Sequence, residues 1–599
     1  MPRPIEVCSD VSVAVMCRLT VGWVTFLATL ALLAGAIWAL PRPRPDAPAS
    51  AGRVTLSIVG TTDLHGRVFP SEGRGGLEQL GGYLHNLREA RARDGGAVLL
   101  LDAGDTFQGG IESNLSEGAL VVDAYNALGY DALAVGNHEF EFGALDTAVE
   151  DDERSDMRGA LKAAAARAMF PFLAANLINE VTGRPVDWPN IRPSTIVDTS
   201  GLRVGIVGVM THDGLTKTLA ANVQGLRTAA LVPTVEAEAR RLRQRGTDVV
   251  VVLAHAGGRC EQFDDPADLS SCDNGAEIFR LARQLSPGLV DTIVAGHSHA
   301  AVAHEVAGIP IVQAYSWGRA FARVDLTFER GAGVVSTRLF SPQAVCAAVD
   351  ADGACGVGDG AAPPHYEGDR VEPAAFVAEA MQPALKRVDR WRNASLGAAL
   401  DTPLVRNRDG LESPLGNLFA DALRAAVPGA DVAIGLGARR GGLRADLPRG
   451  LLTRGPLYDT YPFDNRVVTL QLTGTQLERI LAGVVGGAPR GLPSVSGVRV
   501  RMACREGRRE VDVLRSSGAP VGRSEALIVA TTDFFARFAA RVSFDSAGPL
   551  SVASLAQAPL VRNAVADWVT TQGRRLRAAD LSALPRWEAP NGAVCLAAD

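Results

Sequence analysis

Five short polar clusters between residues 63 and 299 each follow a run of apolar residues that is typical of a buried parallel strand. The predicted strands cover residues 54–60, 97–101, 132–135, 249–254 and 289–295. The clusters after them are Asp63-Leu64-His65, Asp102-Ala103-Gly104-Asp105, Gly136-Asn137-His138-Glu139, His255 and Gly296-His297-Ser298-His299. Open α/β sheets place ligand sites just beyond the carboxyl ends of their strands. We therefore expect the five segments to meet at one edge of a sheet.

The side chains in these clusters are of the types that bind a pair of divalent cations. Carboxylate, imidazole and amide groups occur together, and five of the nine histidines of the chain lie in the clusters. Two cations about 3.5 to 4 Å apart need a bridging carboxylate surrounded by such a mixture. A single Asp-x-His or Asn-His is more often a turn or a satisfied polar pair, so the prediction depends on all five clusters together.

The length and composition predict a globular protein with more than one domain. A chain of 599 residues is too long for a single hydrophobic core, and its 47% hydrophobic and 21% charged residues are ordinary values. The chain contains 60 Lys plus Arg residues and 66 Asp plus Glu residues, which gives a net charge of -6. This balance offers no basic surface for nucleic acid, so nucleic acid is not an expected partner.

Residues 21–40 form an uninterrupted apolar stretch that is long enough to span about 30 Å of hydrocarbon. It is predicted to be either a transmembrane anchor or a signal peptide, since small-residue cleavage sites occur at 34–36 and 49–51. Residues 1–20 would be an N-terminal tail that begins at Met1 or Met16, and 41–53 a Pro/Ala-rich linker. Both interpretations predict export to the periplasm or cell surface, with attachment to the inner membrane if the segment is not cleaved.

Two α/β domains are predicted after this segment. Residues 54–345 alternate apolar strands with amphipathic helical stretches, a βαβ rhythm, and 346–401 form a linker loop and helix. Residues 402–599 form the second domain. The predicted helices of the first domain and linker are 77–93, 156–169, 232–245 and 373–392. The second domain is predicted to contain strands at 432–436, 467–472, 498–502 and 527–531, and helices at 417–427, 474–485 and 560–573.

Six cysteines follow the apolar stretch, and none has the Cys-x-x-Cys spacing of a zinc site. In an exported chain this favours three disulfides over free thiols. Pairing in sequence order would join Cys260 to Cys272, Cys346 to Cys355, and Cys504 to Cys595. Other pairings stay open, because six cysteines allow about 15 connectivities.

The order of the motifs resembles that of the calcineurin-like metallophosphoesterases, and Thr61-Thr62-Asp63-Leu64-His65-Gly66 is similar to their 5'-nucleotidase branch, of the bacterial exported 5'-nucleotidase and UDP-sugar hydrolase type. Segments 412–421, 441–448 and 461–465 resemble the nucleotide-binding domain of that family. The resemblance covers roughly residues 54 to 570. It implies an α/β fold, with an αββα sandwich as the metallophosphoesterase domain and a C-terminal α/β domain that binds the substrate.

The resemblance also implies which residues bind the metal ions. The expected ligands of the first metal are Asp63, His65 and His299, those of the second are Asn137, His255 and His297, and the bridging carboxylate is Asp105. The cofactors would be two divalent ions such as Zn, Mn, Co or Fe. Hydrolysis would follow from attack of metal-bound hydroxide on phosphorus.

His138 follows a predicted ligand, and the resemblance implies that it acts on the leaving group, by donating a proton or stabilising charge. Its partner in the family is an Asp three residues later, where this chain has Glu141. Glu is one methylene longer than Asp. We expect the dyad to persist with a changed geometry; the alternative is that His138 is structural.

Substrate-binding residues are implied in the C-terminal domain. Arg444 matches an Arg of the family that contacts oxyanions, and Arg406 or Arg408 is expected to add a second guanidinium. Phe463 matches the first of two aromatic residues that sandwich a nucleobase.

Two departures from the family pattern affect recognition of the base. The glycine-rich segment that carries the second aromatic residue is replaced by residues 533–542, in which Phe534, Phe535 or Phe538 could substitute for it. Arg439 replaces an Asn of the family. We therefore expect a broad tolerance for different bases.

The sequence thus predicts an exported dimetal phosphohydrolase that acts on a small phosphoester, with nucleotides as the expected substrates. One alternative is a sulfate-thiol hydrolase of the same fold. Another is a non-catalytic surface binding protein, which is disfavoured because a binding module does not need a full set of metal ligands.

Overall fold

The computed structural model describes residues 52–589, with gaps at 146–155, 357–359, 407–410, 438–441, 464, 488–490, 506–507, 544–551, 555–557 and 574. Within these residues, no helix has both the length and the apolar character needed to cross a membrane. The predicted anchor or signal segment at 21–40 lies outside them, and so do Arg408 and Arg439.

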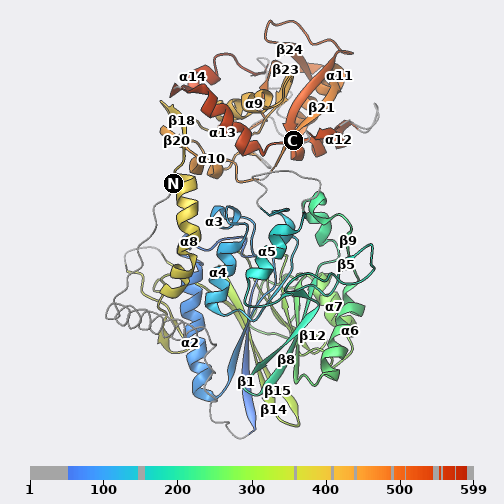
Figure 1. The fold of residues 1–599 in the computed structure, drawn as a ribbon, viewed down its shortest axis with the longest axis vertical. Coiled ribbons are helices and arrows are strands. Elements are labelled where there is room, and N and C mark those ends of the chain that lie inside the picture. Colours follow the sequence, from blue (N-terminus) through green and yellow to red (C-terminus); the bar gives the residue numbers. More distant parts are fainter. Residues whose placement is uncertain are drawn as a thin grey trace, which may run out of the picture. The chain divides into compact units, whose positions relative to one another are not determined.

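Two packed β-sheets form the centre of the N-terminal half (Figure 1). The first has the order β15-β14-β1-β2-β3-β4-β6 and the second β12-β13-β11-β10-β8-β7. The strands of the first sheet are β1 (Arg53–Thr61), β2 (Ala97–Asp102), β3 (Ala132–Ala134), β4 (Phe172–Leu173), β6 (Ile191–Arg192), β14 (Ala320–Glu329) and β15 (Gly333–Ala344). Those of the second are β7 (Ser194–Thr199), β8 (Leu202–Met210), β10 (Val249–His255), β11 (Thr292–Ala295), β12 (Ala301–Val306) and β13 (Ile309–Ala314).

The two sheets bury their facing sides against each other. Ile58 and Leu99 of the first sheet share one hydrophobic cluster with Leu253 of the second, and all three are fully buried. At Gly60 the sheets approach so closely that an added Cβ would lie 2.4 Å from Cγ1 of Val294. Burial on both faces explains why these strands are continuous apolar runs in the sequence.

Helices cover the outer faces and complete the predicted αββα sandwich. The helices α2 (Leu77–Asp94) and α4 (Ala119–Leu128) pack on the first sheet, and α8 (Ala375–Arg392) packs against these two helices. The helices α6 (Leu231–Gln244) and α7 (Glu277–Gln284) cover the second sheet. The remaining helix of this group, α5, comprises Gly159–Arg167. The helices predicted at 77–93, 156–169, 232–245 and 373–392 are therefore confirmed.

The five predicted strands that precede the polar clusters are confirmed, but they do not belong to one sheet. β1, β2 and β3 are parallel neighbours in the first sheet, whereas β10 and β11 are parallel neighbours in the second. The expectation of a single sheet edge was therefore wrong. A doubly buried strand has the same apolar sequence in either sheet, so the sequence pattern cannot separate the two arrangements.

The C-terminal half contains a five-stranded sheet of order β22-β19-β25-β21-β26 and two three-stranded sheets, β20-β18-β27 and β24-β23-β28. Its strands are β18 (Ser395–Leu400), β19 (Val432–Ile434), β20 (Gly450–Thr453), β21 (Val467–Thr473), β22 (Val495–Ser496), β23 (Val498–Arg505), β24 (Arg508–Arg515), β25 (Ala526–Thr532), β26 (Val552–Ser554), β27 (Arg575–Leu576) and β28 (Trp587–Glu588). Its helices are α9 (Pro414–Ala426), α10 (Arg454–Thr460), α11 (Gly474–Gly487), α12 (Asp533–Ser543), α13 (Val561–Gln572) and α14 (Ala578–Leu581). The strands and helices predicted for this half are confirmed.

Two of the predicted disulfides are present, Cys260–Cys272 and Cys346–Cys355. The third, between Cys504 and Cys595, involves side chains outside the described part of the chain and stays a prediction.

Candidate metal centre

The predicted ligands lie on short turns at the ends of the strands, and most of them have an unusual backbone conformation. Five of the seven have a positive φ, namely Asp63 (50°), His65 (50°), Asp105 (57°), His297 (78°) and His299 (53°). A positive φ is uncommon for residues other than glycine and costs free energy. The surrounding structure must therefore hold these turns, and such strain gathers at functional sites.

Glu139 holds two of these turns together. Its Oε2 accepts hydrogen bonds from the backbone N–H groups of Gly136 (2.7 Å) and Asp105 (2.9 Å), and its Oε1 accepts one from the N–H of Thr106 (2.6 Å). Burial and the nearby Asp105 carboxylate raise the pKa of Glu139 to about 7. The sequence alone indicates no role for Glu139, although it lies in the Gly-Asn-His-Glu cluster.

Asp102 also supports the turn that carries Asp105. Its Oδ1 accepts hydrogen bonds from the Gly104 N–H (2.9 Å) and the Thr106 hydroxyl (2.8 Å), while its Oδ2 accepts them from Thr61 (2.6 Å) and Tyr125 (2.8 Å). Burial raises the pKa of Asp102 to about 6. The Asp105 turn is thus fixed by two buried carboxyl groups.

The three residues predicted to bind the first metal lie together. Nε2 of His65 is 2.9 Å from Nε2 of His299, and the latter atom is 3.3 Å from Oδ1 of Asp63. One potential ligand atom from each residue lies within 4.8 Å of the others.

The residues predicted to bind the second metal also converge, with Asp105 beside them. Nε2 of His255 lies 3.1 Å from Oδ2 of Asp105, 3.1 Å from Nδ1 of His297 and 3.2 Å from Oδ1 of Asn137. Asp105 also belongs to a group with His65 and His138, whose potential ligand atoms lie within 4.8 Å of one another. Asp105 therefore lies between the two groups, as a bridging carboxylate must.

The orientation of the side chains fits a pair of bound cations. Nδ1 of His65 is 2.9 Å from the Gln108 carbonyl and Nδ1 of His255 is 2.8 Å from that of Ala103, so both rings turn Nε2 towards the centre. Oδ2 of Asp63 accepts two hydrogen bonds, from the Thr62 hydroxyl (2.6 Å) and the His297 N–H (2.9 Å). Its buried Oδ1 accepts none from the described residues. The nearest polar neighbour quoted above for this oxygen is Nε2 of His299, itself a predicted ligand, and a metal ion held by both residues would satisfy the buried oxygen.

The protonation of these groups reflects their crowding. Burial disfavours ionisation of Asp105, but His255, His138 and His65 lower its pKa below the usual range. Burial favours neutral His255, yet the Asp105 carboxylate raises its pKa to about 10. Burial together with His255 lowers the pKa of His297 to about 4. The imidazoles and the buried carboxylate therefore shift one another's pKa values, because they share one small volume. A bound cation would supply the positive charge that this cluster needs.

The structure places the predicted pair His138 and Glu141 side by side. Nδ1 of His138 lies 2.9 Å from Oε1 of Glu141, and Nε2 lies 4.0 Å from Oδ2 of Asp105. Burial lowers the pKa of His138, but contact with Glu141 and the Asp105 carboxylate outweighs it and raises the pKa to about 9. The longer Glu side chain thus reaches the ring as the shorter Asp of the family would.

Lys217 is a further charged residue at the centre, and it lies outside the five sequence clusters. Its Nζ lies 3.1 Å from Nε2 of His297 and 3.1 Å from Oδ2 of Asp213. Lysines occur at only three positions in the chain, and this rarity was the one signal the sequence offered.

The predicted substrate-binding residues of the C-terminal half also meet. The Arg444 guanidinium lies 5.0 Å from the centre of the Phe463 ring, a cation–π distance. Arg406 donates to the Arg444 carbonyl and pairs with Asp446, its Nε lying 2.8 Å from Oδ1 of that residue. Arg406 therefore braces the Arg444 turn, and Arg408 lies outside the described residues.

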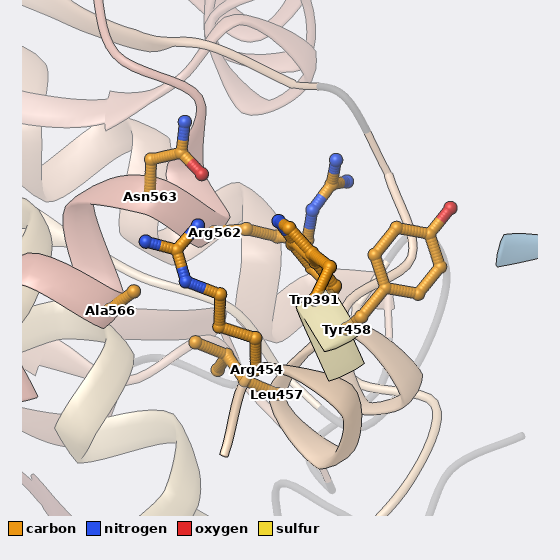
Figure 2. A pocket seen from close by; sticks show the side chains of 7 residues that line it. All are labelled: Trp391, Arg454, Leu457, Tyr458, Arg562, Asn563 and Ala566. Atoms are coloured by element: carbon orange, nitrogen blue, oxygen red, sulfur yellow. The ribbon is translucent and has the colours of Figure 1, made fainter. Parts of the chain in front are cut away.

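Arg562 on α13 was not predicted. It is buried, donates a 2.5 Å hydrogen bond to the Phe463 carbonyl, and lies 4.6 Å from the centre of the Tyr458 ring. The side chains of Arg562 and Tyr458 line a small cleft (Figure 2). The other lining residues are Trp391, Arg454, Leu457, Asn563 and Ala566. With a volume of about 10 Å³ the cleft holds at most one water molecule. The cleft is therefore too small to bind a substrate.

The segment predicted to lack the second aromatic residue forms helix α12. Phe535 of this helix is half-buried against a hydrophobic cluster, and its ring lies 5.5 Å from that of Phe538. Phe534 is exposed. The helix thus turns two of its three phenylalanines towards each other.

Both halves of the chain match known families. The calcineurin-like phosphoesterase family matches residues 56–301, and the 5'-nucleotidase C-terminal domain matches residues 395–542. Protein UshA of Yersinia enterocolitica is 26% identical over 454 residues, which are 72% of this chain and 76% of that protein. Endonuclease YhcR of Bacillus subtilis is 25% identical over 513 residues, 83% of this chain. The chain spans only 38% of the length of YhcR.

A solved structure agrees at the level of the fold. The 5'-nucleotidase precursor from Thermus thermophilus aligns over 90% of this chain and 100% of its own, with a TM-score of 0.53 and 24% sequence identity. The chain therefore combines a calcineurin-like phosphoesterase domain with a 5'-nucleotidase C-terminal domain.

Proposed function

We propose that this protein is a metal-dependent phosphohydrolase that hydrolyses nucleotides or related phosphoesters. The observation that carries the proposal is the convergence of seven potential metal-binding side chains from two sheets, with Asp105 between the two groups. Families of phosphoesterases and 5'-nucleotidases match both halves of the chain, which supports the reaction class.

In this proposal Asp63, His65 and His299 hold one divalent ion, Asn137, His255 and His297 hold the other, and Asp105 bridges them. Two such ions supply positive charge to the phosphoryl oxygens and lower the pKa of water at the site. Asn137 is neutral, and the set contains only two carboxylates. A loaded centre would therefore keep a net positive charge that attracts a phosphate dianion.

His138 serves the leaving group. Glu141 occupies Nδ1 of the ring, so Nε2 stays on the side of Asp105, where it can donate a proton to the departing oxygen. The proton comes back to the ring from solvent after each turnover, because the side chain is partly exposed.

We assign the substrate tail to the C-terminal half. Phe463 offers a ring for stacking and Arg444 a guanidinium for oxyanions, with Arg406 holding the Arg444 turn. Residues 54–345 would be the catalytic domain, 346–401 a linker and 402–599 the substrate-binding domain. The apolar stretch 21–40 supports export to the periplasm or cell surface.

Metal analysis combined with a substrate panel tests this proposal. The purified full-length chain should contain two divalent ions and hydrolyse at least one class among nucleoside monophosphates, UDP-sugars, cyclic nucleotides and aryl phosphates. Adding an S-sulfonated cysteine peptide to the panel tests the alternative sulfate-thiol reaction. Metal binding without turnover of any phosphoester would contradict the proposed function and favour a binding protein.

A further inference from the structure

A short aromatic turn follows β13 in the catalytic half and has the same unusual backbone as the predicted ligands. Tyr315 and Trp317 have φ values of 48° and 65°. For bulky residues a positive φ is an outlier, and it costs free energy that glycine would not incur. Their side chains are nevertheless 42% and 38% exposed, so burial of the rings does not fully offset that cost.

This turn is fastened to the candidate metal centre at both ends. The N–H of Trp317 donates a 2.7 Å hydrogen bond to the carbonyl of Asp63, and the N–H of Tyr315 donates a 2.9 Å bond to the carbonyl of Ala300, next to His299. The centre of a Trp317 ring lies 6.3 Å from that of His299, with the planes at 74°. An exposed indole therefore stands beside a predicted ligand of the first metal.

Arg319 completes the arrangement. Its guanidinium lies 4.4 Å from the centre of the Trp317 ring, so it holds one side of the indole in place. It also adds positive charge next to a centre that would bind a phosphate dianion. The part of the indole that is exposed to solvent offers an apolar surface at the rim of the site.

We propose that Trp317 forms a binding subsite for a planar aromatic group bonded directly to the phosphoryl oxygen, so that the protein binds and hydrolyses aryl phosphomonoesters. An aromatic ring joined to phosphate through one oxygen atom stays close to the phosphorus, as the indole stays close to His299. Offset or edge-to-face packing of the two rings would supply the affinity. This inference rests on the proposed function, because the phosphoryl group must occupy the metal centre.

The subsite differs from the one assigned to Phe463. A nucleobase is separated from its 5'-phosphate by a ribose, and Phe463 belongs to the C-terminal half. The Trp317 turn is built entirely from the catalytic half. The two aromatic residues therefore contact different parts of different substrates.

Binding of two phosphonates that cannot be hydrolysed tests the subsite without relying on turnover. Isothermal titration of the metal-loaded full-length protein should show phenylphosphonate binding roughly tenfold more tightly than methylphosphonate, within the range that aromatic stacking supplies. In Trp317→Leu this ratio should fall close to one, while the affinity for methylphosphonate is unchanged. Trp317→Phe should retain most of the preference, because it keeps an aromatic ring. Phe376→Leu, at a 49% exposed aromatic residue of α8, is the matched control and should keep the full ratio.

Three results would overturn the subsite. The unmodified protein could fail to prefer phenylphosphonate, Trp317→Leu could keep the preference, or Trp317→Leu could weaken both phosphonates equally. The last result would mean that Trp317 only supports the Asp63 turn. A preference that depends on Trp317 in a protein that hydrolyses no phosphoester would instead uphold the subsite and contradict the proposed function.

Discussion

The backbone N–H of Asp105 donates a 2.9 Å hydrogen bond to Oε2 of Glu139, so the predicted bridging carboxylate is positioned by a second, fully buried carboxyl group. Because Oε1 of Glu139 binds the N–H of Thr106, both of its oxygens are needed as acceptors. The geometry of the metal centre therefore depends on a residue that has no predicted contact with the metals.

Glu139→Gln should weaken metal binding. The amide of Gln replaces one acceptor oxygen by an NH2 group, which would face the N–H of Thr106 or those of Gly136 and Asp105. Loss of such an outer partner typically costs about 10- to 100-fold in metal affinity. Competition with a chromogenic chelator measures the change. Glu261→Gln, at an exposed carboxylate, is the control, and equal affinities in the two variants would show that Glu139 does not position the site.

Asp105→Asn should lower activity by more than the roughly 100-fold expected for loss of an outer hydrogen-bond partner. The change removes a negative charge shared by both groups of ligands, so both metal sites and the activated water are affected together. Turnover and metal content should be measured on the same sample. Asp198→Asn is the control because that carboxylate is exposed. Near-normal turnover with two bound metals would remove Asp105 from the bridging role.

His138→Asn should slow esters with poor leaving groups more than those with good ones. A general acid contributes about 10²- to 10⁴-fold when the departing oxygen needs a proton. A p-nitrophenolate ion leaves without one, so its release should be affected least. Comparing kcat for AMP and p-nitrophenyl phosphate gives the difference. Glu141→Gln should show the same trend more weakly, and an equal loss on both esters would assign His138 a structural role.

Phe463→Ala should impair nucleotide hydrolysis and spare a simple aryl phosphate. Stacking of a base on an aromatic ring is worth roughly 1 to 3 kcal/mol, and an aryl phosphate has no base at that distance. The ratio of kcat/KM for AMP to that for phenyl phosphate is the measurement. Equal losses on the two substrates would indicate that Phe463 acts only through the fold, where it contacts Tyr461 and Arg444.

The apolar strands and the potential ligands could be predicted because each signal is local. A run such as 249–254 followed by His255 specifies a buried strand and the polar residue at its end. Whether two such strands share a sheet depends on pairings between distant residues. The Gly60–Val294 approach between the sheets, for example, has no local signature.

Other features of the site depend on backbone geometry that a single sequence does not reveal. Glu139 accepts hydrogen bonds from three N–H groups on two turns. The position of Trp317 depends on a positive φ and on a hydrogen bond from its N–H to the Asp63 carbonyl. Helix α12 was missed for a different reason. The resemblance implies a glycine-rich loop at this position, although the spacing of Phe535, Phe538 and Ala539 suits one face of a helix.

Stepwise metal reconstitution tests the central claim most directly. The protein would be stripped with a chelator, and divalent metal would be added back while AMP hydrolysis and bound metal are measured. The proposed two-metal site predicts negligible activity in the stripped protein and a plateau at two equivalents per chain. Full activity in the stripped protein, or a plateau at one equivalent, would contradict it.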